Sequence, residues 1–447
     1  MIKIYDTMTR SLRDFVPLTE NVVNMYVCGP TVYNYIHIGN ARSAVAFDTI
    51  RRYFEYCGYT VNYISNFTDV DDKIIKAANE AGISTKELSD KFIAAFMEDT
   101  GQLGIKPATQ NPRVINYMDE IIAFVSTLVD KGFAYVSEGD VYFRVAKSNN
   151  YAKLANKTLE DLEIGASGRT DAETERKENP LDFALWKAAK EGEVSWDSPW
   201  GPGRPGWHIE CSVMATEILG DTIDIHGGGA DLEFPHHTNE IAQSEAKTGK
   251  TFANYWMHNG FVNVDNEKMS KSLGNFVTVH DMLQTVDGQV LRFFLATQQY
   301  RKPINFTEKA IHDAEVNLKY LKNTHSLPLT DQVNQDELQT YLEAFQEAMD
   351  DDFNTANGVT VLFDMAKWIN SGNYDQTVKD DFEKMLQVFG IVFEEEVLDE
   401  DIEKLIEERQ AARANKDFAT ADRIRDELAA QGIKLLDTKE GVRWTRD

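Results

Sequence analysis

The chain of 447 residues is 42% hydrophobic and 11% aromatic, which is enough to bury the cores of several domains and excludes a disordered chain. Its net charge of −27 excludes a protein that coats nucleic acid by overall attraction, although screening within ~8 Å still permits a local basic groove. Three cysteines, no signal peptide and no apolar run of ~18 residues predict a cytoplasmic protein without a membrane span.

The first third of the chain predicts a parallel α/β sheet. Residues 25–29 form a short apolar run that ends before Pro30, as a buried strand would. Apolar residues then recur at helical spacing up to Gly58, which suits a helix C-terminus, and a second strand is expected from residue 60. Ser84 and Glu87 predict the start of a helix that runs toward residue 103. This alternation of strands and helices favours a parallel sheet.

The periodicity changes further along the chain. Residues 133–145 alternate as in a β-hairpin, strand signals return near residues 221 and 255, and helical patterns follow residue 307. The last unit is nearly neutral, with ten Lys or Arg and eleven Asp or Glu, unlike the acidic body. The patterns predict a sheet domain (residues 1–114 and 201–306), an insertion (115–200), a helical region (307–393) and a small C-terminal unit (401–447).

The loop PTVYNYIHIGN joins the first predicted strand to the first predicted helix. A helix N-terminus at the carboxyl end of a parallel strand presents free N–H groups and a partial positive charge, which suits a phosphate group. His37 and Asn40 would add side-chain donors there. The alternative is that His37 only caps the helix, and the spacing alone leaves both interpretations open.

The segment KMSKSLGN places Lys268 and Lys271 in a loop rich in serine and glycine. Ammonium groups on flexible stems suit a pyrophosphate that has to be bound and then released. A solvated basic turn would have the same composition, so this segment alone does not decide its role.

Together, the two segments resemble the paired HIGH and KMSKS signatures of class I aminoacyl-tRNA synthetases. The motifs CGPTVY, HIGNAR, WHIECS, HGGGADLEFPHHTNE and KMSKSLGN, in this order, are similar to those of the cysteinyl-tRNA synthetase family. The resemblance extends from Met25 through KDFATADRIRDEL to the C-terminal GVRW. Asn40 departs from the HIGH signature, which has a histidine there, and asparagine can donate a hydrogen bond but carries no charge.

The resemblance implies an architecture and a set of substrates. The fold would be a Rossmann-like parallel-sheet catalytic domain with an inserted connective domain, followed by a helical bundle that braces tRNA and a small C-terminal α/β domain that reads the anticodon. The implied partners are tRNA(Cys), L-cysteine and ATP with Mg²⁺, and the implied state is a monomer. The residues that match catalytic or ATP-binding positions are His37, Asn40, Gly228, Asp231, Lys268 and Lys271.

A further group of residues has the chemistry of a metal site. In the helical stretch HHTNEIAQSEA, His236 and Glu240 are four residues apart and leave the same face, whereas His237 is rotated by about 100° and is disfavoured. With Cys28 and Cys211, the donors would suit Zn²⁺ better than Mg²⁺ or Ca²⁺. A buried thiol and a surface ion pair are the alternatives. The resemblance implies a zinc ion held by residues matching Cys28, Cys211, His236 and Glu240, with the substrate thiol joining the metal.

Other residues match positions that the family places near substrate or tRNA. Thr68, Trp207 and Asp231 would lie near the substrate, although Trp207 could equally be a core aromatic. The glycines at 227–229 would let the backbone approach a nucleotide, or form only a turn. In the C-terminal unit, Arg443 and Trp444 form a pair suited to binding unpaired bases. The basic residues of the helical run before them would either face tRNA or form solvated ion pairs; they are Arg409, Arg413, Lys416, Arg423 and Arg425.

The predicted function is the ATP-dependent ligation of L-cysteine to tRNA(Cys) through a cysteinyl-adenylate. A metal-based site rejects a serine competitor by ~10⁴–10⁵, so no separate editing domain is expected. One alternative is the related ligase that joins cysteine to a glucosaminyl-inositol in mycothiol synthesis, against which residues 401–447 argue. The other is a catalytically silent RNA-binding paralogue, against which His37, Lys268 and Lys271 argue.

Overall fold

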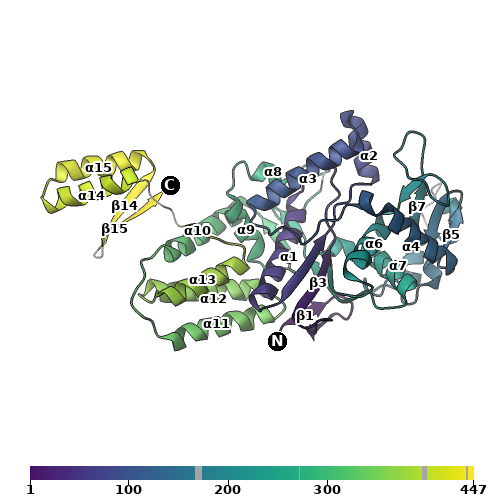
Figure 1. The fold of residues 1–447 in the computed structure, drawn as a ribbon, viewed down its shortest axis with the longest axis horizontal. Helices are drawn as coiled ribbons and strands as arrows, with labels where there is room; N and C mark the ends of the chain where they lie inside the picture. Colours follow the sequence, from purple (N-terminus) through teal and green to yellow (C-terminus); the bar gives the residue numbers. More distant parts are fainter. Residues whose placement is uncertain (167–173, 271, 395–399, 439–440, 447) are drawn as a thin grey trace. The chain divides into compact units, whose positions relative to one another are not determined.

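The computed structural model describes residues 1–166, 174–270, 272–394, 400–438 and 441–446, in two compact units, Met1–Val392 and Phe393–Asp447 (Figure 1). The larger unit is built on a parallel sheet with the strand order β10-β9-β3-β4. Its strands are β3 (Val22–Val27), β4 (Thr60–Ser65), β9 (Ile223–Gly229) and β10 (Ala253–Asn259). The parallel sheet predicted from the sequence is confirmed, and its first strand begins three residues earlier than expected, at Val22.

Helices connect the parallel strands and cover the sheet. The predicted helix after the signature loop is α1 (Ile38–Tyr56), followed by Gly58 with a φ of +93°, a conformation that favours glycine. Ser84 caps α3 (Thr85–Gln102) by accepting from the Glu87 backbone N–H, as predicted. The helix α2 (Asp72–Ala81), which was not predicted, precedes it. The remaining helices of this layer are α6 (Trp207–Leu219) and α7 (Thr238–Thr248).

The insertion folds as an antiparallel sheet with the order β5-β6-β7-β8. The predicted hairpin is β5 (Ala134–Ser137) and β6 (Asp140–Phe143), and the sheet continues past residue 200 to include β8. Part of the charged stretch 169–178 lies outside the described residues. The other elements of the insertion are α4 (Met118–Asp130), α5 (Leu159–Ala166), β7 (Phe183–Ala188) and β8 (Gly203–Pro205).

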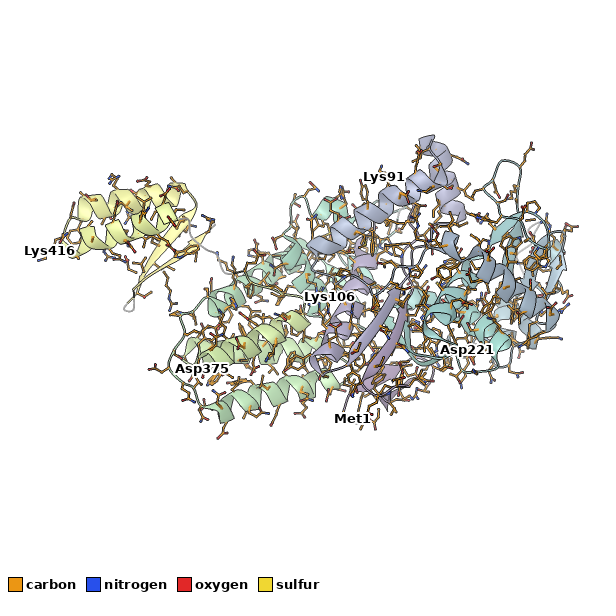
Figure 2. All side chains as sticks on the ribbon, viewed as in Figure 1. Met1, Lys91, Lys106, Asp221, Asp375 and Lys416 are labelled. Atoms are coloured by element: carbon orange, nitrogen blue, oxygen red, sulfur yellow. The ribbon has the colours of Figure 1, made fainter. Side chains whose placement is uncertain are left out.

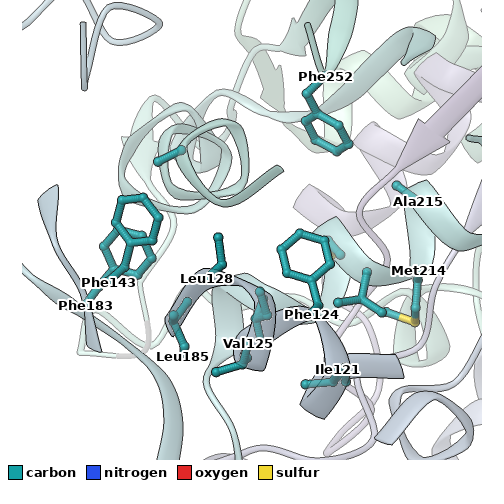
Figure 3. Close-up of a cluster of buried hydrophobic side chains, with 14 of the residues drawn as sticks. Ile121, Phe124, Val125, Leu128, Phe143, Phe183, Leu185, Met214, Ala215 and Phe252 are labelled. Carbon is teal, nitrogen blue, oxygen red and sulfur yellow. The ribbon is translucent and has the colours of Figure 1, made fainter. Parts of the chain in front are cut away.

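One hydrophobic core joins the insertion to the parallel-sheet region. Figure 3 shows Phe124 and Leu128 of α4 between the aromatic pair of the insertion sheet and Met214 of α6. That pair, Phe143 and Phe183, stacks with ring centroids 5.1 Å apart. Because one cluster of buried side chains contains residues of both parts, the insertion packs directly against α6, which carries Cys211.

The rest of the larger unit contains short strands and a helical region. A hairpin of β1 (Lys3–Asp6) and β2 (Ser11–Asp14) lies at the N-terminus, and β11 (Val262–Val264) pairs with both β12 (Glu267–Lys268) and β13 (Ile304–Phe306). Helical structure follows, as the sequence predicted for residues 307–393. The helices after β13 are α10 (Glu308–His325), α11 (Gln335–Asp350), α12 (Thr355–Asn370) and α13 (Gln376–Val388), and two more, α8 (Val279–Met282) and α9 (Gly288–Ala296), lie between β12 and β13.

The smaller unit consists of α14 (Glu400–Ala414), α15 (Phe418–Ala430) and an antiparallel hairpin of β14 (Ile433–Thr438) and β15 (Gly441–Arg446). Lys416 lies at the turn between its two helices (Figure 2). Arg409 is buried and forms a bidentate pair with Asp437, with both N–O distances 2.9 Å, so this arginine holds the helix to the hairpin. Trp444 packs against the small core and is half-buried. No described helix of either unit is long and apolar enough to cross a membrane.

Candidate active site

A cavity of about 680 Å³ lies at the carboxyl ends of the parallel strands, where open α/β sheets place their ligands. The loop after β3 and the start of α1 form one wall, and segments that follow β9, β10 and β12 form others. The two signature segments therefore meet at one cavity, although more than 200 residues separate them in the sequence. Six of the predicted site residues line it: Cys28, His37, Asn40, Trp207, Asp231 and Lys268.

His37 and Asn40 form a reciprocal cap at the start of α1. The Asn40 backbone N–H donates to His37 Nδ1 and the His37 backbone N–H donates to Asn40 Oδ1, each at 3.1 Å. The capping interpretation of His37 is thus correct, and it is compatible with phosphate binding because both residues also line the cavity. The asparagine at position 40 supplies the second acceptor of this cap, which stabilises the helix N-terminus.

The residues just after KMSKSLGN (268–275, the lysine loop) are joined to the first signature segment by backbone hydrogen bonds. The Ile38 N–H donates to the Val277 carbonyl at 3.1 Å, and the Val279 N–H donates to the Ile36 carbonyl at 3.0 Å. Lys268 lies on the cavity wall, with Nζ 5.7 Å from the centre of the Phe261 ring. Lys271 lies outside the described residues. The two backbone hydrogen bonds therefore hold the segment that follows the lysine loop against the start of α1.

The four predicted metal ligands come together. Their donor atoms lie within 4.8 Å of one another, although they belong to the end of β3, α6, the turn before α7, and α7 itself. The Cys28 Sγ atom lies 3.5 Å from Cys211 Sγ and 3.3 Å from Glu240 Oε1, and His236 Nε2 lies 3.0 Å from the same carboxylate oxygen. Cys211, His236 and Glu240 are buried, whereas Cys28 is half-buried and reaches the cavity.

A second set of donors, not predicted from the sequence, overlaps the first. His226 and His237 form another possible metal-binding group with Cys28 and Glu240. His226 Nε2 lies 2.6 Å from Glu240 Oε2, and His237 Nε2 lies 3.4 Å from Cys28 Sγ. The helical rotation that disfavoured His237 does not exclude it, because residues three apart on a helix are also neighbours, and His237 Nε2 lies 4.0 Å from Glu240 Oε1. On its other side, His237 Nδ1 lies 2.8 Å from Nε2 of the buried His258.

Electrostatic interactions prepare this cluster for a cation. Burial alone would raise the pKa of Glu240, but His226 and His236 hold it well below its usual range. Burial would lower the pKa of His236, whereas Glu240 and Cys211 raise it to about 10. A hydrogen bond from the Cys28 thiol lowers the pKa of Cys211 to about 6 against the effect of burial. These shifts favour anionic Glu240 and Cys211 beside a protonated His236. A divalent ion bound to the three groups could replace the proton on His236.

The other residues predicted to lie near the substrate or ATP differ in whether they line the cavity. Trp207 is 41% exposed and stacks on His236 with ring centroids 4.2 Å apart, so it is not a core aromatic. Asp231 lines the cavity beyond β9. Gly228 instead lies behind this wall, where an added Cβ would be 3.1 Å from the His237 ring. Thr68 is buried, and its hydroxyl accepts a hydrogen bond from Asn66 Nδ2 at 3.2 Å.

Family profiles match nearly the whole chain. Residues 14–316 match the profile described as tRNA synthetases class I (C) catalytic domain, residues 344–394 the DALR domain, and residues 395–444 the cysteinyl-tRNA ligase anticodon binding domain. The fold and the cavity are thus those of a class I aminoacyl-tRNA synthetase. The chain is 94% identical to the cysteine–tRNA ligase of Streptococcus thermophilus (strain CNRZ 1066) and 82% identical to that of Streptococcus agalactiae serotype III (strain NEM316), over 100% of each chain. The chain belongs to the cysteine–tRNA ligase family.

Solved structures with much lower identity share the fold. Mycobacterium tuberculosis methionyl-tRNA synthetase in complex with methionyl-adenylate is 15% identical, with a TM-score of 0.59 over 82% of this chain and 89% of that chain. A LeuRS from Agrobacterium radiobacter K84 is 10% identical, with a TM-score of 0.60 over 84% of each chain. At such identities, the similarity shows the class I fold alone.

Proposed function

We propose that the chain ligates L-cysteine to tRNA(Cys) at the expense of ATP, through a cysteinyl-adenylate. The observation that carries the proposal is the position of Cys28. Its thiol lies within 3.5 Å of Cys211 and Glu240, and the same residue lines the cavity that contains His37 and Lys268. A cluster able to recognise a thiol therefore opens onto segments able to bind ATP phosphates, as the activation of cysteine by ATP requires.

The phosphate side of the cavity is assigned to the two signature segments. The N-terminus of α1 supplies backbone donors and a partial positive charge, to which His37 and Asn40 add side-chain groups. Lys268 and Lys271 would neutralise the charge that develops as pyrophosphate leaves, together with Mg²⁺ carried by ATP. Asp231 would bind the ribose or the substrate amino group. Of the glycines at 227–229, Gly229 lines the cavity and would allow the nucleotide to approach the backbone, whereas Gly227 and Gly228 pack behind it against Phe47 and the His237 ring.

The cysteine side of the cavity is assigned to Cys28, Cys211, His236 and Glu240 as zinc ligands. Two thiols, an imidazole and a carboxylate within 4.8 Å fit Zn²⁺ in donor type and number. A zinc ion bound there would stabilise the thiolate of the substrate and disfavour a serine hydroxyl, which is harder and far less acidic. Trp207 would cover His236, and the Thr68 hydroxyl would orient the substrate.

The chain supplies no covalent nucleophile in this proposal. The substrate carboxylate attacks the α-phosphate of ATP, forming cysteinyl-adenylate and releasing pyrophosphate, and a hydroxyl of the terminal tRNA ribose then displaces AMP. Catalysis consists of holding these groups in line and stabilising negative charge.

The regions beyond the cavity are assigned to tRNA. We assign the connective insertion to residues 115–200, whose sheet is completed by β8 of the following segment, within a catalytic domain of residues 1–114 and 201–306. We assign tRNA bracing to residues 307–393 and anticodon reading to residues 401–447. The match of residues 395–444 to an anticodon-binding profile supports the last assignment. The monomeric state and the cytoplasmic location stay predictions from the sequence.

Exchange of labelled pyrophosphate into ATP tests the proposed activation step. The full chain with its metal should catalyse exchange that depends on cysteine and is not supported by serine, and should then charge total tRNA with cysteine. A lack of cysteine-dependent exchange would contradict the proposal and favour a silent RNA-binding protein. Exchange without tRNA charging would also contradict it, and would favour a ligase that uses a small-molecule acceptor such as a glucosaminyl-inositol.

A further inference from the structure

We infer that Asn66 is a positioning residue that sets the cysteine pocket of this synthetase, an inference that rests on the proposed function. Asn66 follows β4 and is completely buried. Its side-chain amide contacts three groups from separate parts of the chain: the Gly29 backbone N–H, the Thr68 hydroxyl and the Cys211 thiol. Each of these groups belongs to, or adjoins, a residue assigned to cysteine recognition.

The first contact ties Asn66 to the end of β3. The Gly29 N–H donates to Asn66 Oδ1 at 2.9 Å. The two backbones also pack closely, because a Cβ atom at position 29 would lie 1.7 Å from the Asn66 carbonyl oxygen. Only glycine permits this approach, so the peptide that follows Cys28 is held against Asn66 by both a side-chain hydrogen bond and a backbone contact.

The orientation of the amide follows from this first contact. Since Oδ1 accepts from the Gly29 N–H, Nδ2 is directed to the Thr68 hydroxyl, to which it donates at 3.2 Å. Thr68 Oγ1 therefore receives a hydrogen bond on one lone pair and keeps its own hydrogen for donation. Asn66 thus fixes the position of Thr68 and leaves the Thr68 hydroxyl able to donate.

The third contact extends the arrangement to the metal ligands. The Cys211 Sγ atom lies 3.7 Å from Asn66 Oδ1. One neutral amide therefore lies against the Cys211 sulfur, the peptide that follows Cys28, and the Thr68 hydroxyl. A carboxylate in its place would repel the Cys211 thiolate and could not donate to Thr68.

The first test compares Asn66→Asp with Asn62→Asp in the full-length, zinc-loaded protein. Asn62 lies on β4, the strand that Asn66 follows, and donates through Nδ2 to Asn24 Oδ1 at 2.9 Å, away from the cavity, so it serves as the control. In Asn66→Asp, we expect the KM for cysteine in pyrophosphate exchange to rise about tenfold or more, with the KM for ATP changed less than twofold. Zinc retention against a chelator should fall by about 10–100-fold, and the visible absorption of the Co²⁺-substituted protein should change. Asn62→Asp should change none of these.

A second test uses Asn66→Ser with Thr68→Val. If Asn66 acts partly through Thr68, the effects of these two substitutions on the KM for cysteine will not multiply in the double variant. The inference would be overturned if Asn66→Asp raised the KM for ATP as much as the KM for cysteine, or if Asn62→Asp gave the same response. It would also be overturned if the effects of Asn66→Ser and Thr68→Val on the KM for cysteine multiplied in the double variant. A wild-type chain without cysteine-dependent exchange would instead overturn the proposed function, so the two failures are distinguishable.

Discussion

Replacing Cys211 by serine tests whether the thiol cluster holds a metal that recognises the substrate. Serine keeps the size of the side chain but is a poor zinc ligand, since its hydroxyl stays protonated near neutral pH. Structural zinc sites contribute ~10–16 kcal/mol, so one of four ligands accounts for ~3–4 kcal/mol. Zinc retention should therefore weaken by ~10²–10³-fold in Cys211→Ser. The fold should survive, because a hydroxyl replaces the thiol at this buried position without a large change in volume.

The matched control is Cys57→Ser. Cys57 ends α1, is half-buried, and lies beside Tyr53 rather than among the four clustered donors. Burial raises the pKa of its thiol, which favours an inert, protonated group. Metal content measured during competition with a chelator, and cysteine-dependent pyrophosphate exchange, should both fall in Cys211→Ser and stay unchanged in Cys57→Ser.

X-ray absorption of the zinc-loaded protein completes this test. Saturation with cysteine should add a sulfur scatterer at ~2.3 Å from zinc. An unchanged zinc spectrum would show that the metal is structural and does not bind the substrate thiol. Full zinc retention in a folded Cys211→Ser variant would refute the ligand assignment itself.

Four further predictions concern other parts of the chain. Lys271→Ala should reduce pyrophosphate exchange more strongly than Lys268→Ala without a change in thermal stability, and near-normal exchange in folded Lys271→Ala would contradict its role. Truncation after Val392, at the boundary of the two compact units, should spare cysteine activation and abolish most tRNA charging, whereas unimpaired charging would leave the smaller unit a stabilising role alone. Arg292→Met should lower the free energy of unfolding by ~3–5 kcal/mol in denaturant titrations, because the buried Asp48, 2.6 Å from Arg292, would lose its main partner, and a change below ~1 kcal/mol would refute this. His280→Gln should raise the KM for ATP and leave that for cysteine unchanged, because the His280 ring stacks on Tyr35 of the first signature segment at 4.2 Å, and equal KM values in variant and wild type would exclude this role.

Local patterns explain why much of the fold could be predicted. Buried parallel strands form short apolar runs, which is how β3 and β4 were found, and the β5–β6 hairpin alternates in the usual way. The helix α2 has the equally local signals of an Asp71 N-cap and a left-handed Gly82, but its acidic start resembles a loop and it was missed. Those caps could have revealed it.

The candidate site was predictable only where a motif or a regular period marks it. His236 and Glu240 are related by the helical repeat, and the two cysteines entered through resemblance to a family. His226, His258 and Asn66 belong to no such pattern, because their contacts join residues that are far apart in sequence. His237, three residues before Glu240, also reaches the cluster, and the spacing of four residues that favoured His236 did not reveal it.

The burial of the donor cluster determines how a substrate can reach it. Cys211, His236 and Glu240 are each no more than 2% exposed, and the Trp207 ring stacks on His236. Cys28, in contrast, is half-buried and lines the cavity. If the proposed function holds, a substrate thiol would approach the cluster past Cys28, and its carboxylate would lie on the side of α1 and Lys268. A serine bound in the same orientation would present a hydroxyl to these donors, and a protonated hydroxyl cannot replace a thiolate on zinc. Discrimination would then occur before the adenylate forms, which makes later editing unnecessary.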